Sequence, residues 1–258
     1  MNPQPRWCAL VPLFDNGDTV AGVVAHLLER LPHVIVVDDG SRDGGPDTLP
    51  DLPEITLVRH GCNRGKGAAV RTGIHTARAL GFTHVVQVDA DAQHDLDDIP
   101  RFLEASAVAP GAVLAGERIW DDNAPESSRF GHRFGMFWYR LETGGHPLRD
   151  TQCGFRVYPT DLLDQVPAQE DRMAFDVEIL ARSVLAGIPV LGLPTRVRYA
   201  PPGAHRSHFR PFSDNVAMSW LHARLTVRHW LASLPRVRPL LDVRDRRRAA
   251  RIARRREA

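Results

Sequence analysis

The chain has 258 residues, of which 43% are hydrophobic and 25% charged, proportions that are usual for a water-soluble globular protein. No uninterrupted apolar stretch approaches the roughly 20 residues that a membrane-spanning helix needs, so the sequence predicts none. The formal net charge of +2 hides an asymmetry, because residues 236–258 carry ten arginines and three acids, a balance of +7, which leaves −5 for the rest.

Along the first half of the chain, short runs rich in Val and Ile alternate with helical patterns, which is typical of a parallel sheet with crossover helices. We predict strands at 7–13, 34–37, 55–59, 84–89, 112–116 and 190–199. Helices are predicted at 17–31, 66–80, 95–107 and 174–187. The fold class is therefore α/β, a Rossmann-like and mostly parallel sheet flanked by helices, with ligands expected at the carboxyl ends of the strands.

The second half of the chain is less regular. Residues 117–150 are rich in aromatic and basic side chains and show few strand signals. Between 213 and 234 the apolar residues, which include Trp220 and Trp230, can share one broad face of an amphipathic helix. We therefore divide the chain into a main domain (1–211), an amphipathic helix (212–235) and an Arg-rich, flexible tail (236–258).

Two carboxylates follow the fourth predicted strand, in the tripeptide Asp89-Ala90-Asp91. Mg²⁺ and Mn²⁺ prefer hard oxygen ligands, usually one or two carboxylates together with waters and substrate oxygens. Asp89 and Asp91 are therefore predicted metal ligands, although one of them can instead contact a ribose. Gln93 or His94 can add a ligand or a supporting hydrogen bond. A cap between strand and helix is the alternative for the two acids.

The only lysine of the chain, Lys66, stands between two glycines at the start of a predicted helix, in a protein that otherwise uses 32 arginines. Helix N-termini attract phosphate, and a compact ammonium group fits where a planar guanidinium does not. We therefore expect Lys66 to bind phosphate groups of a ligand, with a solvated surface lysine as the alternative.

The loops that follow the predicted strands occur in a characteristic order. They are Pro12-Leu13-Phe14-Asp15-Asn16, Asp38-Asp39-Gly40-Ser41, Asn63-Arg64-Gly65-Lys66-Gly67 and Asp89-Ala90-Asp91, followed later by Asp150-Thr151-Gln152-Cys153-Gly154-Phe155-Arg156. With these motifs the sequence, over roughly residues 7–211, resembles the family 2 glycosyltransferases of the GT-A fold. The resemblance is closest to the branch of polyprenyl- and dolichyl-phosphate mannosyl- and glucosyltransferases. It implies an inverting enzyme that uses a nucleoside-diphosphate sugar (a UDP- or GDP-sugar) and Mg or Mn.

The resemblance also implies roles for residues around the donor. Asp39, or its neighbour Asp38, would hydrogen-bond the base or ribose, and Arg118 would approach the donor phosphates. The first loop departs from the Pro-x-Tyr-Asn-Glu motif of relatives. Phe14 can stack on the base, but Asn16 lacks the carboxylate of the Glu that would contact the base in relatives. The identity of the nucleotide is therefore left open. The predicted donor-binding residues are Pro12, Phe14, Asn16, Val37 (against the base), Asp38, Asp39, Lys66, Asp89, Ala90 and Arg118.

The acceptor side of the reaction has fewer candidates. An acceptor hydroxyl needs a general base within hydrogen-bond reach, whereas an acceptor phosphate, already anionic, needs almost none. Asp150 is the first residue of the motif at 150–156 and is the candidate catalytic base or acceptor-site acid. Asp176 and Glu178 are the alternatives, although their helical spacing also fits a structural role. His208 follows a Pro-Pro-Gly turn and is a candidate for completing the metal shell.

Residues 212–258 raise the question of a membrane surface. An amphipathic helix with two tryptophans is typical of an interfacial helix, and the basic tail would be attracted to anionic lipid. The alternative is a helix that packs on its own domain, followed by a solvated tail. We expect a lipid-type acceptor and a protein that is peripheral on the inner face of the cell membrane. A cytoplasmic location is expected because three widely spaced cysteines indicate reduced thiols.

Two other functions stay open. A degenerate, non-catalytic family member could act as a membrane or partner adaptor, which the altered first loop and the basic tail favour. A sugar nucleotidyltransferase shares the nucleotide-binding layout, but such enzymes have a Gly-x-Gly-x-Arg loop after the first strand, and this chain has no similar loop. We expect no nucleic-acid partner, because aromatic residues do not interleave with the charges of the tail.

Overall fold

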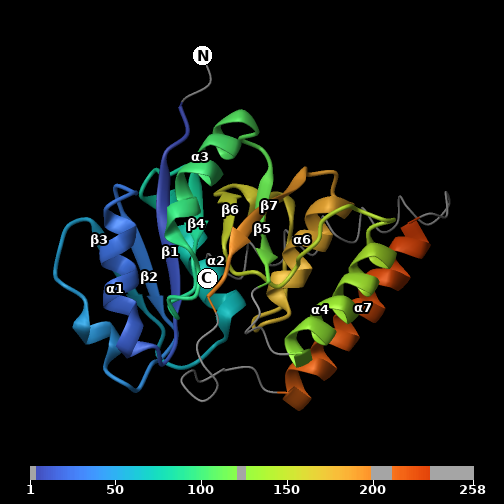
Figure 1. The fold of residues 1–258 in the computed structure, drawn as a ribbon, viewed down its shortest axis with the longest axis horizontal. Coiled ribbons are helices and arrows are strands. Elements are labelled where there is room, and N and C mark those ends of the chain that lie inside the picture. The colour runs from blue at the N-terminus through green and yellow to red at the C-terminus, as the bar shows by residue number, and fades with distance from the viewer. Residues whose placement is uncertain (1–3, 121–125, 199–210, 233–258) are drawn as a thin grey trace, which may run out of the picture.

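A computed structural model of the protein describes residues 4–120, 126–198 and 211–232, and its middle layer is a seven-stranded sheet (Figure 1). The strand order is β3-β2-β1-β4-β6-β5-β7. The strands are β1 (Trp7–Leu13), β2 (Val34–Asp38), β3 (Ile55–Arg59), β4 (His84–Gln87), β5 (Val113–Ile119), β6 (Arg156–Pro159) and β7 (Val190–Arg196). The helices are α1 (Gly17–Leu28), α2 (Lys66–Ala79), α3 (Ile99–Val108), α4 (Glu126–Glu142), α5 (Leu162–Gln165), α6 (Phe175–Leu185) and α7 (Pro211–Ala232), with short 3₁₀ turns η1 (Gly45–Thr48) and η2 (Leu96–Asp98).

The sheet is mostly parallel, which confirms the predicted α/β class. β1 pairs in parallel with β2 and β4, β2 with β3, and β5 with β7. The exception is β6, which runs antiparallel between β4 and β5. β6 was not predicted, because it is a four-residue strand, Arg-Val-Tyr-Pro, that is buried on both sides and so shows no alternation.

Alternate residues of β1 belong to two different cores, one on each face of the sheet, as the two-residue period of a strand requires. Ala9 and Val11 pack with α1 and α3. Cys8 and Leu10 pack with α2 and α6, and the apolar sides of α4 and α7 join this second core. The helices therefore cover both faces of the sheet and leave the carboxyl ends of its parallel strands for the loops that carry the motifs.

Helices α4 and α7 lie side by side at one end of the molecule (Figure 1). A buried contact of 2.6 Å between His222 Nδ1 and Glu142 Oε1 joins them. The segment 117–150 was predicted without an element, so α4 is an addition. Its core-facing side includes the buried Glu142, whereas Phe134 and Phe137 are exposed, so no simple apolar stripe marks the helix. α7 falls where an amphipathic helix was expected: Leu221 packs in the core, whereas Trp220 is 64% exposed. Of the helices that the structure describes, none combines the length and apolarity needed to cross a membrane.

Candidate functional site

The loops after β1, β2 and β4 meet at one edge of the sheet, because parallel strands end on the same side. The backbone N–H of Arg42 donates to the Asp15 carboxylate (2.7 Å), which ties the loop after β2 to the loop after β1. The hydroxyl of Thr19 donates to the carbonyl oxygen of Ala90 (2.6 Å), which ties α1 to the loop after β4. The motifs predicted to form one site are therefore brought together.

A chain of four alternating charges occupies the centre of this edge. Lys66 Nζ lies 2.8 Å from Asp89 Oδ1 and 3.0 Å from Asp176 Oδ2. Arg156 Nη1 lies 3.5 Å from the other carboxylate oxygen of Asp176. Burial alone would lower the pKa of Lys66, but the Asp176 and Asp89 carboxylates outweigh it and raise that pKa. Lys66 is therefore a fixed ammonium group held between two acids, and a solvated surface lysine is excluded.

The amino end of α2 is occupied by other parts of the chain. The Gly65 N–H donates to Asp39 Oδ2 (2.6 Å), and the Ala68 N–H donates to the carbonyl oxygen of Asp171 (3.0 Å). A phosphate at this edge would consequently meet the side chain of Lys66 rather than these two N–H groups. Phosphate binding by Lys66 at the start of α2 stays a prediction.

Asp38 and Asp39 are both buried, and both have partners in the structure. Asp39 Oδ1 accepts from the Arg64 N–H (2.9 Å) and contacts His60 Nδ1 (2.7 Å), in addition to the bond from Gly65. Asp38 Oδ1 accepts from the Ser41 N–H (2.8 Å) and closes the turn after β2. The two acids thus shape the loop and the start of α2, and their contact with a nucleotide stays a prediction.

The first carboxylate of the Asp-Ala-Asp motif, Asp89, is confined on three sides. Lys66 lies on one side, and His94 Nε2 lies 3.6 Å from Asp89 Oδ2 on another. Burial would raise the pKa of Asp89, but Lys66 and His94 outweigh it and hold that pKa well below its usual value. Gly154 closes the third side, because a Cβ on this residue would lie 2.6 Å from Asp89 Oδ1 and closer still to Oδ2.

The second carboxylate, Asp91, lies in the loop that follows. Its Oδ1 accepts from the Gln93 N–H (3.1 Å), across Ala92, whose φ of 58° turns the chain. Burial and the nearby Asp89 carboxylate raise the pKa of Asp91. Two carboxylates at the carboxyl end of β4, with the Gln93 amide nearby, are the oxygen donors that Mg²⁺ or Mn²⁺ prefers. Among the residues that the structure describes, no three His, Cys, Asp or Glu side chains gather to hold a metal alone, and His208 lies outside those residues.

Asp150, the candidate base, is buried against Arg118 of β5. Arg118 donates through Nε to Asp150 Oδ2 (2.6 Å) and through Nη2 to Oδ1 (3.1 Å). Oδ1 also accepts from the Gln152 and Cys153 N–H groups. Burial would raise the pKa of Asp150, but Arg118 outweighs it and lowers that pKa. This geometry favours a role in holding Arg118 over the predicted role as a base.

The two other candidate bases are also engaged. Asp176 is 3% exposed and pairs with Lys66, so its place is behind the ammonium group rather than beside an acceptor. Glu178 is fully buried, accepts from the Gln169 and Glu170 N–H groups (2.7 Å each) and pairs with Arg182. Glu178 is therefore structural, as its helical spacing allowed.

The remaining donor candidates lie at or near the ends of β1 and β2. Phe14 and Asn16 are half-buried in the loop after β1, where the Asn16 amide donates to the Phe14 carbonyl oxygen (2.9 Å). Pro12 is half-buried in β1 and lies opposite Val37. The Val37 side chain is completely buried in the core beneath α2, so the structure offers no exposed surface of it to a base.

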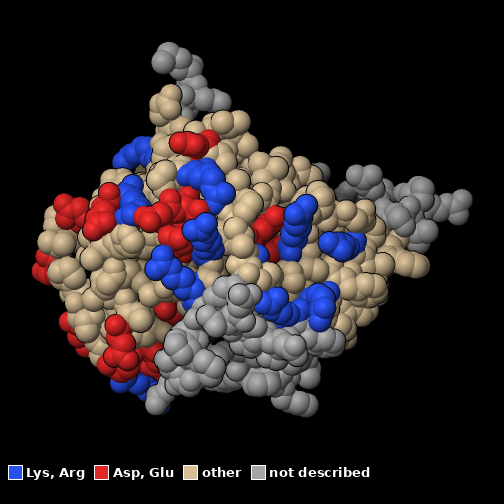
Figure 2. All heavy atoms as spheres, in the orientation of Figure 1, with Lys and Arg blue, Asp and Glu red and all other residues tan. Residues whose placement is uncertain are grey.

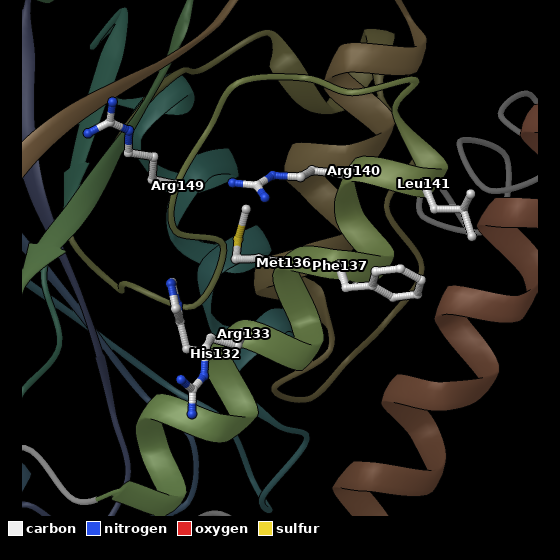
Figure 3. A pocket seen from close by; sticks show the side chains of 7 residues that line it. All are labelled: His132, Arg133, Met136, Phe137, Arg140, Leu141 and Arg149. Carbon is white, nitrogen blue, oxygen red and sulfur yellow. The ribbon is translucent and has the colours of Figure 1, made fainter.

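A pocket of about 650 Å³, which we name the α4 pocket, lies on α4 and was not predicted from the sequence. Besides His132, it is lined by Arg133, Met136, Phe137, Arg140, Leu141 and Arg149. Figure 3 shows Arg140 extending from α4 toward Arg149, with Met136 and His132 on the same side, whereas Phe137 and Leu141 point toward α7. The aromatic and basic composition of 117–150 was the sequence signal for this pocket, but it could be read only once the helix was known.

Charge is unevenly distributed over the surface. On the face drawn in Figure 2, most acidic side chains lie toward α1 and β3, whereas several basic side chains lie across the middle and toward α4. An anionic ligand approaching this face would accordingly be attracted toward the half of the molecule that contains β5 and α4.

Known proteins resemble this chain in sequence and in fold. Residues 8–166 match the family model described as Glycosyl transferase family 2. The chain is 26% identical over 181 residues to UDP-N-acetylglucosamine–dolichyl-phosphate N-acetylglucosaminyltransferase of Methanococcus voltae, a match that covers 62% of this chain and 72% of that protein. It is 23% identical over 214 residues to polyprenol monophosphomannose synthase of Mycolicibacterium smegmatis, covering 75% and 78% of the two chains.

Among solved structures, one similar fold is glucosyl-3-phosphoglycerate synthase from Mycobacterium tuberculosis in complex with Mn²⁺ and uridine-diphosphate-glucose. The TM-score is 0.64 at 15% sequence identity, and the match covers 87% of this chain and 79% of that chain. At this identity the likeness concerns the fold alone, and it confirms the predicted GT-A architecture.

Proposed function

The chain belongs to glycosyl transferase family 2, and from this premise we propose that it transfers a sugar, with inversion, from a nucleoside-diphosphate sugar to the phosphate of a lipid-type acceptor. The proposal includes Mg or Mn as cofactor, UDP or GDP as the nucleotide, and an enzyme that works at the cytoplasmic face of the membrane.

The observation that carries the proposal is the Lys66–Asp89–Asp91 arrangement at the carboxyl end of β4. When the bond between sugar and diphosphate breaks, negative charge develops on the departing diphosphate. A bound divalent ion would neutralise that charge. Asp91, Asp89 and the Gln93 amide would hold the ion. Lys66 Nζ, 2.8 Å from Asp89, would add a second positive charge beside the same phosphates. Asp176 would keep the ammonium group aimed at that place.

A phosphate acceptor agrees with the state of the carboxylates. Asp150, Asp176 and Glu178 are each paired with a basic side chain, so none of them is set up to remove a proton. A phosphate needs no such base, because it is already an anion at neutral pH. Of the relatives described above, one has dolichyl phosphate in its name and the other is named for its product, polyprenol monophosphomannose. Arg118, fixed by Asp150, would lie near the reacting phosphates.

Calorimetry with Mn²⁺ and nucleotides tests the donor half of the proposal. We expect UDP or GDP to bind at least about tenfold more tightly with Mn²⁺ than with excess chelator, a difference of about 1.4 kcal/mol. CTP and ATP serve as controls for general affinity to nucleotides. Binding that does not respond to the metal would favour the adaptor, and formation of a sugar nucleotide from a nucleoside triphosphate and a sugar phosphate would identify a nucleotidyltransferase.

The membrane part of the proposal rests on α7 and on the basic residues after it. Trp220 and Trp230 are each 64% exposed on α7. Residues 233–258, which lie outside the described part of the chain, contain all ten arginines of the tail. We expect truncation after Leu234, which removes a net charge of +7, to weaken binding to anionic liposomes by well over tenfold, because each lost Arg removes about 1 kcal/mol of attraction. Neutral liposomes are the control, and equal sedimentation of both proteins would make the tail a solvated appendage.

A further inference from the structure

The loop between α5 and α6 (166–174) packs closely on the amino end of α2. A Cβ on Gly65 would overlap the carbonyl oxygen of Asp171, and a Cβ on Gly67 would lie 2.6 Å from the carbonyl oxygen of Glu170. Glycine, which has no Cβ, leaves room for the loop at both positions. The loop therefore presses against the chain on either side of the lysine of the donor site.

Hydrogen bonds fix this contact. The Ala68 N–H donates to the carbonyl oxygen of Asp171 (3.0 Å), and Arg71 Nη1 donates to the carbonyl oxygen of Glu170 (2.6 Å). Arg71 also forms an ion pair with the Asp171 carboxylate. Lys66 is the first residue of α2, so the turn that carries it is fastened to this loop as well as to the sheet.

The same loop leads directly into α6, whose second residue is Asp176. Lys66 Nζ lies 3.0 Å from Asp176 Oδ2, so the loop adjoins both members of this ion pair. The ammonium group of a lysine ends a flexible four-carbon chain, and its direction is set by the groups around it. A shift of the loop would therefore move both Lys66 and Asp176 relative to Asp89, which follows β4.

Helix α7 holds the loop by one ion pair. Arg224 Nη2 donates to Glu170 Oε1 (2.6 Å). Leu221 and Leu225, on either side of Arg224 in the sequence, are buried in the core, so the backbone of α7 is fixed at this point. An ion pair that is fully open to water contributes little to stability, but the Arg224 and Glu170 side chains are only 34% and 21% exposed. The pair therefore fastens α7 to the loop that holds Lys66.

We propose that α7 supports the donor site, with Arg224 and Glu170 as positioning residues that hold Lys66 in place through the loop at 166–174. The proposal rests on the proposed function, because it takes Lys66 as a ligand of the donor diphosphate. Misplacement of a group by about 1 Å can lower a rate on the order of a hundredfold, so residues that fix Lys66 contribute to function without touching the donor. The helix whose exposed face is proposed above to meet a membrane would thus also set the geometry of the donor site.

Nucleotide affinity measures this support. The full-length protein would be titrated calorimetrically with UDP and with GDP in the presence of Mn²⁺. Arg224→Gln and Glu170→Gln should each weaken binding of the preferred nucleotide about fivefold, because Lys66 is no longer held beside the diphosphate. The double variant Arg224→Glu/Glu170→Arg should restore most of the affinity, since the ion pair can form again with its charges exchanged.

A double-mutant cycle shows whether the effect passes through Lys66. In a Lys66→Gln background, Arg224→Gln should leave nucleotide affinity unchanged, because the group that the ion pair positions is gone. A general loosening of the fold would instead weaken binding in both backgrounds. Arg78→Gln is the matched control, because Arg78 lies near the other end of α2 and pairs with Asp164. Its nucleotide affinity should equal that of the wild type.

Hydrogen–deuterium exchange of the protein without nucleotide tests the link between α7 and α2 by itself. Both single variants should raise the exchange of the backbone amides at 67–72 and leave that of β1 unchanged. Four outcomes would each overturn the proposal: unchanged exchange at 67–72, wild-type nucleotide affinity in both single variants, no recovery in the charge-exchanged variant, or an equal loss in the Lys66→Gln background. Wild-type nucleotide binding that does not respond to Mn²⁺ would instead overturn the proposed function.

Discussion

Asp91→Asn is expected to lower kcat/KM roughly a thousandfold, because a metal ion at this site contributes several kcal/mol to the stabilisation of the departing diphosphate. The substitution keeps the size of the side chain and its ability to accept from the Gln93 N–H. Stability should therefore change little. Initial rates, together with Mn²⁺ titration followed by electron paramagnetic resonance, would separate loss of the metal from loss of the fold.

Asp97→Asn is the control for this experiment. Asp97 is an acid six residues farther along the chain, it is exposed, and it pairs with Arg30 on the surface. Its conversion to Asn should leave both the rate and the Mn²⁺ affinity near the wild-type values. Near-normal turnover of Asp91→Asn would contradict the assignment of Asp91 as a metal ligand.

Gly154→Ala is expected to lower kcat roughly a hundredfold and to destabilise the fold by about 1–3 kcal/mol. The new methyl group would overlap the Asp89 carboxylate and push it away from Lys66 and His94. Backbone conformation is not the obstacle, because the φ of Gly154 lies outside the left-handed region that only glycine adopts easily. The measurements are steady-state kinetics and denaturant unfolding of the purified variant.

A double-mutant cycle would show whether the effect passes through Asp89. In an Asp89→Ala background the methyl group no longer meets a carboxylate, so Gly154→Ala should cost much less stability than in the wild type. Gly111→Ala is the matched control, since a Cβ there would meet no atom within 4 Å. Equal stability losses in both backgrounds would mean that Gly154 acts through its other neighbours rather than through Asp89.

The fold was largely predictable where each local segment carries its own signal. β1 is a seven-residue apolar run and α2 a long periodic pattern that follows Gly65, and both appear where the sequence places them. β6 and α4 were not predicted. A four-residue strand acquires its identity from the two strands beside it. In α4 the acid Glu142 is buried while Phe134 and Phe137 are exposed, so the apolar pattern does not mark the core-facing side.

The candidate site also has a part that was predictable from the sequence and a part that was not. Asp89, Asp91 and Lys66 were identified from residue type and position after a strand, and the structure brings Lys66 and Asp89 into contact. The state of Asp39, Asp150 and Asp176 could not be predicted, because each is decided by partners that are distant in sequence. Asp150 meets Arg118 from 32 residues away, and Asp39 accepts a hydrogen bond from the N–H of Gly65, 26 residues later and directly before α2.

By itself the sequence determined the α/β class, the family and the acidic motif after β4, since these depend on patterns within a few consecutive residues. Tertiary structure alone decided which carboxylates are already paired, why residue 154 must be glycine, and that α4 carries a cationic pocket with an apolar wall. Those properties depend on distances between side chains from separate elements, and such distances exist only once the sheet has brought the elements together.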